Sequence, residues 1–145
     1  MIVTLDTNAV YQVLHSRNGA SFYILQLVRT RQIELALSVP VYLEYQDVLQ
    51  RDKTLTALGL TKTDVGAFLR FLAYLGKPYD IFYLWRPNLR DEADNMLLEL
   101  AVASRSQWLI TNNIRDFSIG NELRHDGLSI GTPAQFVSLW RQNNE

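Results

Sequence analysis

Cysteine is absent from the sequence, and histidine occurs only twice, at His15 and His125. The absence of cysteine excludes disulfide bonds and thiolate metal sites, and it suits a reducing compartment. Each histidine stands alone, without a second ligand at the spacing that metal sites use, so we expect both to be structural or on the surface. Any metal ion bound by this chain is therefore expected to have oxygen ligands.

Long apolar runs are absent as well. No run approaches the roughly 18 residues that suggest a transmembrane helix. The first residues also lack the basic region and apolar core of an export signal. We therefore expect a cytoplasmic protein that does not associate with a membrane.

Neither sign of charge dominates the sequence. The chain has 14 lysine and arginine residues and 15 aspartate and glutamate residues, and no segment is a run of like charges. Composition thus gives no general indication of nucleic-acid binding. A polyanionic partner would have to be held by a local basic patch or by a metal ion.

The sequence does have an ordinary globular composition, with 48% hydrophobic residues in a length of 145. This length is close to that of a typical single domain and is sufficient to bury one core. No low-complexity segment or linker composition interrupts it. We expect a single domain over residues 1–145.

Apolar runs alternate with segments of helical periodicity along the whole chain. Strands are predicted over residues 1–5, 33–39, 79–85, 108–110 and 128–130. Helices are predicted from a cap at Thr7 or Asn8 to about residue 18, and over residues 21–31, 41–52, 62–75, 91–102 and 133 onward. This alternation predicts an α/β fold with a mostly parallel sheet of roughly four to five strands, covered by helices on both faces.

Acidic residues stand where predicted strands give way to helices. Asp6 follows the first strand, Asp91 and Asp94 begin a helix, and Asp116 follows the strand over 108–110. The carboxyl ends of the strands are the edge at which open α/β sheets bind ligands. Capping of the following helix is the other explanation for an acid at such a position, and it stays open at this stage.

Glu44 is a further acid of interest, on the helix that Pro40 is predicted to open. It lies between apolar neighbours, although an exposed position on the helix would explain it equally well. Carboxylates brought together raise one another's pKa, so a cluster persists only with a compensating cation. A few oxygen ligands favour Mg²⁺ or Mn²⁺, and such an ion suits phosphodiester hydrolysis.

Several segments, in this order, resemble the PIN-domain ribonucleases, especially the VapC-like toxins of bacterial toxin-antitoxin pairs. They are Leu5–Asn8, the helix from Pro40 to Leu49, Arg90–Asn95, Leu109–Phe117 and Gly131–Phe136. Together they extend over essentially the whole chain. The resemblance implies a three-layer α/β/α PIN-like nuclease domain.

The resemblance also implies a metal-dependent endoribonuclease that uses Mg²⁺ or Mn²⁺. Its catalytic and metal-binding acids would be Asp6, Glu44, Asp94 and Asp116, with Asp91 close by. A water activated by the ion would attack the phosphorus of single-stranded or looped RNA.

Polar neighbours are implied at Asn8, Thr111 and Asn112, beside the metal. Many relatives of this subgroup carry an acid where this chain has Asn112. An amide oxygen can still hold a metal ion or its water, so we expect weakened metal affinity, with Asp116 compensating.

RNA contacts are predicted from side chains near these acids. Arg86, Arg90 and Arg115 are candidates for phosphate contacts, and Tyr11 or Tyr45 for stacking on a base. Each of these residues also has a structural explanation, as a solvated charge or a core ring. The resemblance further implies a homodimer and a cognate antitoxin, for which an apolar groove formed by the helices over 21–31 and 61–75 is a candidate site.

Two other classes of function stay open. A phosphatase of the haloacid-dehalogenase type would use Asp6 as a nucleophile, but it requires a second acid two positions on, where this chain has Asn8. A non-catalytic protein-binding module of the same fold would use the acids only as helix caps.

Overall fold

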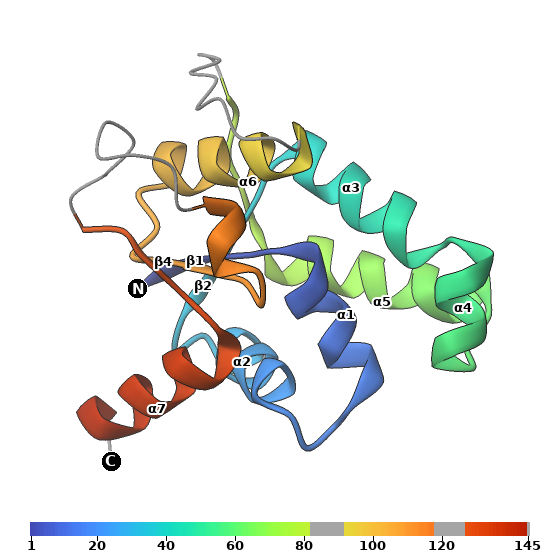
Figure 1. Cartoon of the computed structure of the whole chain (residues 1–145), viewed down its shortest axis with the longest axis horizontal. Helices are drawn as coiled ribbons and strands as arrows, with labels where there is room; N and C mark the ends of the chain where they lie inside the picture. The colour runs from blue at the N-terminus through green and yellow to red at the C-terminus, as the bar shows by residue number, and fades with distance from the viewer. Residues whose placement is uncertain (82–91, 118–126, 145) are drawn as a thin grey trace.

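The computed structural model describes residues 1–81, 92–117 and 127–144 (Figure 1). The strands in these residues are β1 (Ile2–Leu5), β2 (Glu34–Leu37), β3 (Lys77–Pro78), β4 (Trp108–Ile110) and β5 (Ser129–Gly131). They form one five-stranded sheet in the order β3-β2-β1-β4-β5. All neighbouring strands are parallel, with Val3 opposite Trp108 and Ile2 opposite Glu34. The predicted parallel α/β sheet is confirmed.

Helices cover both faces of this sheet. They are α1 (Thr7–His15), α2 (Ala20–Arg29), α3 (Val39–Leu49), α4 (Asp52–Leu58), α5 (Lys62–Leu75), α6 (Glu92–Ala103) and α7 (Pro133–Asn144), with a 3₁₀ turn η1 (Ile114–Phe117) after β4. Figure 1 shows α6 on one side of the strands and α2 with α7 on the other. The three-layer α/β/α arrangement is therefore confirmed. No helix in the described ranges combines the length and apolar character needed to cross a membrane.

The centre of the sheet is fully buried because β1 has neighbours on both sides and helices on both faces. Val3, Thr4 and Leu5, three consecutive residues, are each at most 2% exposed. Such a continuous buried run is typical of a parallel sheet covered on both faces. The Thr4 hydroxyl is paired with the Ser106 hydroxyl at 2.9 Å, so this polar group is buried with a partner.

Helix ends differ from the sequence predictions in informative ways. Asp6, rather than Thr7 or Asn8, is the N-cap of α1. Ser38 caps α3, which begins at Val39, one residue before Pro40. The predicted cap at Thr61 is confirmed as a reciprocal capping box with Asp64.

Three element boundaries were predicted wrongly. The helix expected over residues 41–52 ends at Leu49, and a separate helix α4 follows, because Arg51 adopts an extended conformation between them. Helix α1 ends at His15, before the predicted residue 18. The strand expected over 79–85 does not form at residues 79–81: β3 is Lys77–Pro78, and a backbone hydrogen bond from the Tyr79 N–H to the Leu37 carbonyl extends its pairing with β2. Residues 82–85 of that prediction lie outside the described residues.

Helix packing also bears on the groove expected between residues 21–31 and 61–75. Helix α2 packs on α1 and α7, whereas α5 packs on α3. The two helices therefore belong to different packed groups, and the structure does not support a groove that they share.

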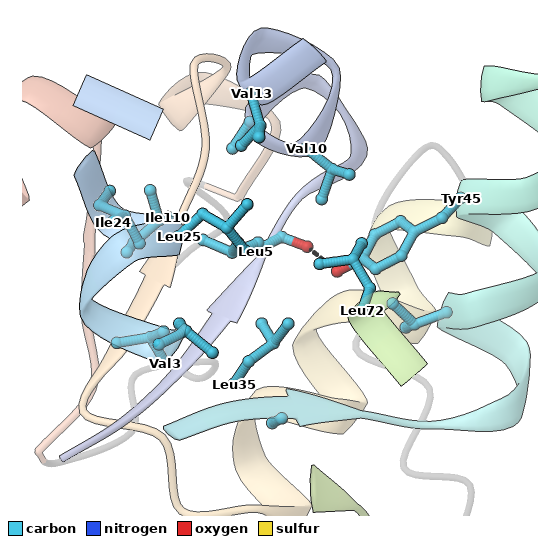
Figure 2. Close-up of a cluster of buried hydrophobic side chains, with 14 of the residues drawn as sticks. Val3, Leu5, Val10, Val13, Ile24, Leu25, Leu35, Tyr45, Leu72 and Ile110 are labelled. Atoms are coloured by element: carbon cyan, nitrogen blue, oxygen red, sulfur yellow. Dashed lines mark hydrogen bonds between the residues drawn. The ribbon is translucent and has the colours of Figure 1, made fainter. Parts of the chain in front are cut away.

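Tyr45 fastens α3 to the central strand. Its side chain is 0% exposed, and its hydroxyl donates a hydrogen bond to the Leu5 carbonyl oxygen at the end of β1. Figure 2 shows this ring reaching from α3 to the core around Leu5. Burial, together with the nearby Asp6 carboxylate, raises the pKa of the Tyr45 hydroxyl, which therefore stays protonated as a donor. A base-stacking role for Tyr45 was wrong, because its ring has no exposed face.

We predict that Tyr45→Phe lowers the free energy of unfolding by about 1–2 kcal/mol, because the hydroxyl is lost while the Leu5 carbonyl stays buried. Urea unfolding followed by circular dichroism measures the change. Tyr74→Phe is the matched control, since Tyr74 is 78% exposed. Equal stability of Tyr45→Phe and the wild type would show that this bond does not anchor α3.

Candidate functional site

A cleft of about 340 Å³ lies beyond the carboxyl ends of β1 and β4. Four acids line it, each from a different part of the chain: Asp6, Glu44, Asp94 and Asp116. We call this the acid cleft. Its other lining residues are Thr7, Asn8, Tyr11, Val48, Ala93 and Asn113. The four acids that the sequence singled out as central are thus brought to one place.

Asp6 is held tightly at the base of the acid cleft. It is 7% exposed, and its carboxylate accepts hydrogen bonds from the Thr7 N–H at 2.6 Å, the Thr111 hydroxyl at 2.6 Å and the Asn8 side-chain amide at 3.2 Å. A carboxylate can accept about four hydrogen bonds, so roughly one position remains for another ligand. Asp6 therefore caps α1 and retains some capacity to bind, which means that the two sequence explanations are compatible.

The pKa of the Asp6 carboxyl is raised above its ordinary value. Burial is the largest cause, and the nearby Asp116 carboxylate adds to it. The hydrogen bonds from Thr111, Thr7 and Asn8 oppose this shift but do not cancel it. A bound cation would favour the ionised form of Asp6 and relieve both effects.

Asn8 connects the ends of the two strands. Its side-chain oxygen accepts a hydrogen bond from the Asn112 backbone N–H at 3.1 Å. Because a backbone N–H can only donate, the Asn8 amide nitrogen must be the group that faces Asp6. Asn8 thus supports the carboxylate of Asp6, and its oxygen is directed at the β4 loop.

The residues after β4 complete this network. The Thr111 side chain, 0% exposed, also accepts a hydrogen bond from the Asn113 N–H at 2.9 Å. The Asn112 amide donates to the Asn8 oxygen at 3.4 Å, and Asn112 lies among the residues of a separate hollow. Its neighbour Asn113, which sequence reasoning missed, is the asparagine that lines the acid cleft.

The remaining acids come from helices. Glu44 on α3 and Asp94 in the first turn of α6 are both half-buried, while Asp116 on η1 is exposed. Helices α3 and α6 pack against each other. Glu44 and Asp94, one from each of these helices, therefore both reach the cleft. Val48, one turn after Glu44, reaches the cleft from the same face of α3.

Other predicted site residues are placed differently. Arg115 is exposed on η1 and is not among the residues lining the acid cleft. Tyr11 does line it, with its ring stacked on His15 at a centroid distance of 5.8 Å. Asp91, Arg86 and Arg90 lie outside the described residues.

The donor set fits a hard cation that keeps part of its water shell. All the candidate ligands are carboxylate or amide oxygens, and Asp6 has an unused acceptor position. Within residues 1–81, 92–117 and 127–144, no three acids are close enough as placed to hold an ion directly. Mg²⁺ commonly binds through one or two carboxylates and several waters, so this spacing suits it.

The fold and the site define an α/β protein with an acid-lined cleft at the carboxyl edge of a parallel sheet. A family model for the PIN domain matches residues 2–115. Since this is most of the chain, the protein belongs to the PIN domain family, and the resemblance found in its sequence motifs is confirmed.

Comparison with solved structures also finds chains of similar fold. The chain is similar to a chain in the crystal structure of VapBC2 from Rickettsia felis bound to a DNA fragment from their promoter. The TM-score is 0.57 and the sequence identity is 22%, over 90% of this chain and 97% of that chain. A comparison with curated proteins found no match. At this identity, the structural likeness concerns the fold.

We predict that Asp6→Asn makes the metal-free protein more stable at neutral pH. The pKa of Asp6 is higher in the folded protein than in the unfolded chain. Protonated Asp6 therefore stabilises the fold at low pH, below the unfolded-state pKa, and this stabilisation is lost as the pH rises through the folded-state pKa. The asparagine side chain of the variant does not ionise, so the variant does not lose stability in this pH range. Urea unfolding in chelator between pH 3 and pH 7 measures it, with the exposed Glu34→Gln on β2 as control. A variant that is less stable than the wild type at pH 7 would mean that the hydrogen bonds of Asp6 outweigh its burial.

Proposed function

We propose that this protein is an endoribonuclease that depends on Mg²⁺ or Mn²⁺ and acts as the toxin of a toxin-antitoxin pair. The observation that carries the proposal is the convergence of Asp6, Glu44, Asp94 and Asp116 on one cleft from four separate elements. Membership of the PIN domain family supports it. So does the fold shared with a chain of the VapBC2 structure, because VapC-like toxins are the group that the sequence resembles.

In this proposal, Asp6 and Asp94 would hold the metal ion directly, and Glu44 and Asp116 would bind it or orient its waters. When bound, the ion lowers the pKa of a coordinated water and neutralises charge on the phosphate. Thr111 and Asn8 keep the Asp6 carboxylate in place through their hydrogen bonds. Tyr11 borders the cleft, where an RNA base can stack on its ring.

Among the residues that the structure describes, no side chain in the acid cleft is an evident general base. The buried Asp6 already accepts three hydrogen bonds, and the other acids are assigned to the ion. The described residues of the cleft would therefore hold the ion and orient its waters, and none of them is assigned to remove a proton.

Partners are part of the same proposal. An antitoxin would bind an apolar surface, and the exposed apolar side chains on α3 and α5 are suited to it: Val39, Leu43, Phe71 and Tyr74. These two helices pack on each other, unlike the pair of helices expected from the sequence. The proposal also includes a homodimer.

The decisive experiment compares the wild type with Glu44→Gln and Asp94→Asn. Calorimetry with Mn²⁺ measures metal binding, and cleavage of a labelled single-stranded RNA is followed with Mn²⁺ and with chelator. We expect metal-dependent cleavage by the wild type and a loss of about a hundredfold or more in each variant, because even outer-shell changes cost about 10–100-fold. Asp47→Asn is the control, since Asp47 is an exposed acid on the same helix as Glu44.

The result also separates the proposal from a non-catalytic binding module. If the purified wild type, freed of any bound partner, neither binds Mn²⁺ nor cuts RNA, the acids are structural and the nuclease assignment is wrong. Equal activity of Asp94→Asn and Asp47→Asn would remove Asp94 from the metal site.

A further inference from the structure

A second and larger hollow of about 610 Å³ lies where the start of α2 meets α7. Its lining contains two arginines, Arg17 and Arg141, and no acidic residue. Polar side chains without charge, including Asn18 and Gln26, complete the rim. We call this hollow the basic groove. In a chain with a formal net charge of −1, such a local excess of positive charge stands out as a surface for an anion.

Arg141 is oriented before any ligand arrives. Its guanidinium lies 4.7 Å from the centre of the Tyr23 ring. An arginine stacked in this way keeps its planar group fixed, while the N–H groups at its edge remain able to bind a phosphate in a forked geometry. Neither Arg141 nor Arg17 forms an ion pair with a carboxylate among the described residues. Both positive charges are therefore uncompensated in the groove.

The backbone adds donors at the same place. Helix α2 begins at the groove with Gly19 as its N-cap, and no side chain caps its first N–H groups. Ser21 in its first turn is 5% exposed and lines a smaller hollow beside the basic groove, and its hydroxyl has no hydrogen-bond partner among the described residues. By contrast, α7 is capped by Thr132 and Gln135, which satisfy each other's N–H groups. The open end of α2 thus adds a partial positive charge to that of the two arginines.

This smaller hollow, of about 160 Å³, adjoins the basic groove on the side of the β4 loop. It shares Gly19, Ala20 and Ala134 with the basic groove. At its other end it is lined by Asn112, whose neighbour Asn113 lines the acid cleft. The Asn112–Asn113 segment thus lies between the hollow beside the basic groove and the acid cleft, where an extended ligand would pass from one to the other.

We propose that the basic groove binds the phosphodiester backbone of the RNA strand whose scissile bond lies at the acid cleft, an inference that rests on the proposed nuclease function. The four acids of the cleft repel RNA wherever a metal ion does not compensate them, and the whole chain exerts no general attraction. Affinity for the strand must then come from phosphates bound away from the cleft. Arg17, Arg141 and the start of α2 provide that binding. Because such contacts do not read bases, the groove sets affinity and register and leaves base selection to other residues.

The test uses the full chain and a labelled single-stranded RNA of 12 nucleotides, with binding measured by fluorescence anisotropy in chelator at 50 and 200 mM KCl. Each phosphate contact contributes about 0.7 to the slope of log affinity against log salt for a single strand. Loss of two contacts in Arg17→Ala/Arg141→Ala should lower the slope by about 1.4. Between 50 and 200 mM KCl, the affinity of the wild type for RNA should therefore fall by a factor about seven times larger than that of the variant.

The matched control is Lys53→Ala/Arg70→Ala, which removes two exposed positive charges from α4 and α5. Figure 1 shows these helices on the opposite side of the molecule from α7. We expect this control to keep the wild-type slope. In the presence of Mn²⁺, the wild type should cleave the 12-nucleotide RNA with a higher kcat/KM than a four-nucleotide RNA. The groove variant, Arg17→Ala/Arg141→Ala, should lose this difference in kcat/KM.

The outcomes separate this inference from the proposed function. If the groove variant and the control have equal slopes, the groove does not bind RNA, whether or not the wild type cleaves it, and a different partner such as a protein must be sought for it. If the wild type cuts no RNA with Mn²⁺, the nuclease function fails. A lower slope in the groove variant would then still support backbone binding by the groove.

Discussion

The buried carboxylate of Asp6 is the constraint on which the rest of this structure depends. Asp6 is 7% exposed, and burying a charged carboxylate is unfavourable unless hydrogen bonds compensate it. Three donors hydrogen-bond to this carboxylate and offset part of the cost of its burial. The donors come from the start of α1 and from the end of β4. The bonds that make the charge tolerable therefore also fix the edge of the sheet, so the cleft is part of the fold and not an addition to it.

The other acids depend on rigid elements rather than on loops. Tyr45 joins α3 to the end of β1, one residue from Asp6, and so fixes the position of the adjacent Glu44. Packing of α3 on α6 places Asp94 on the same cleft. Sites built on helices and strands hold their geometry more closely than sites on loops. This arrangement suits an ion that is held through few protein ligands.

Sequence reasoning anticipated the parts of the site that follow from topology. Asp6 and Asp116 come after buried strands, and a parallel sheet brings the carboxyl ends of such strands together. Glu44 lies within a helix, where no rule of topology applies; its apolar neighbours drew attention to it, and the family resemblance gave it a role in the site. The role of Tyr45 was missed because a tyrosine among apolar neighbours has the same pattern whether its hydroxyl reaches water or a buried carbonyl. The basic groove was missed for a related reason, since Arg17 and Arg141 meet only in three dimensions.

The central strand β1 has a further consequence for how the chain forms its acid cleft. Its hydrogen-bonded neighbour β4, and the threonine that holds Asp6, come late in the chain, with Asp6 and Thr111 separated by 105 positions. Contacts so distant in sequence form slowly, and a chain that emerges from the ribosome at about 5–20 residues per second exposes β1 well before β4. A growing chain therefore holds Asp6 without the Thr111 hydroxyl, its one distant donor among the three, for some seconds. The acid cleft can therefore take its final form around Asp6 only after β4 and Thr111 have been synthesised.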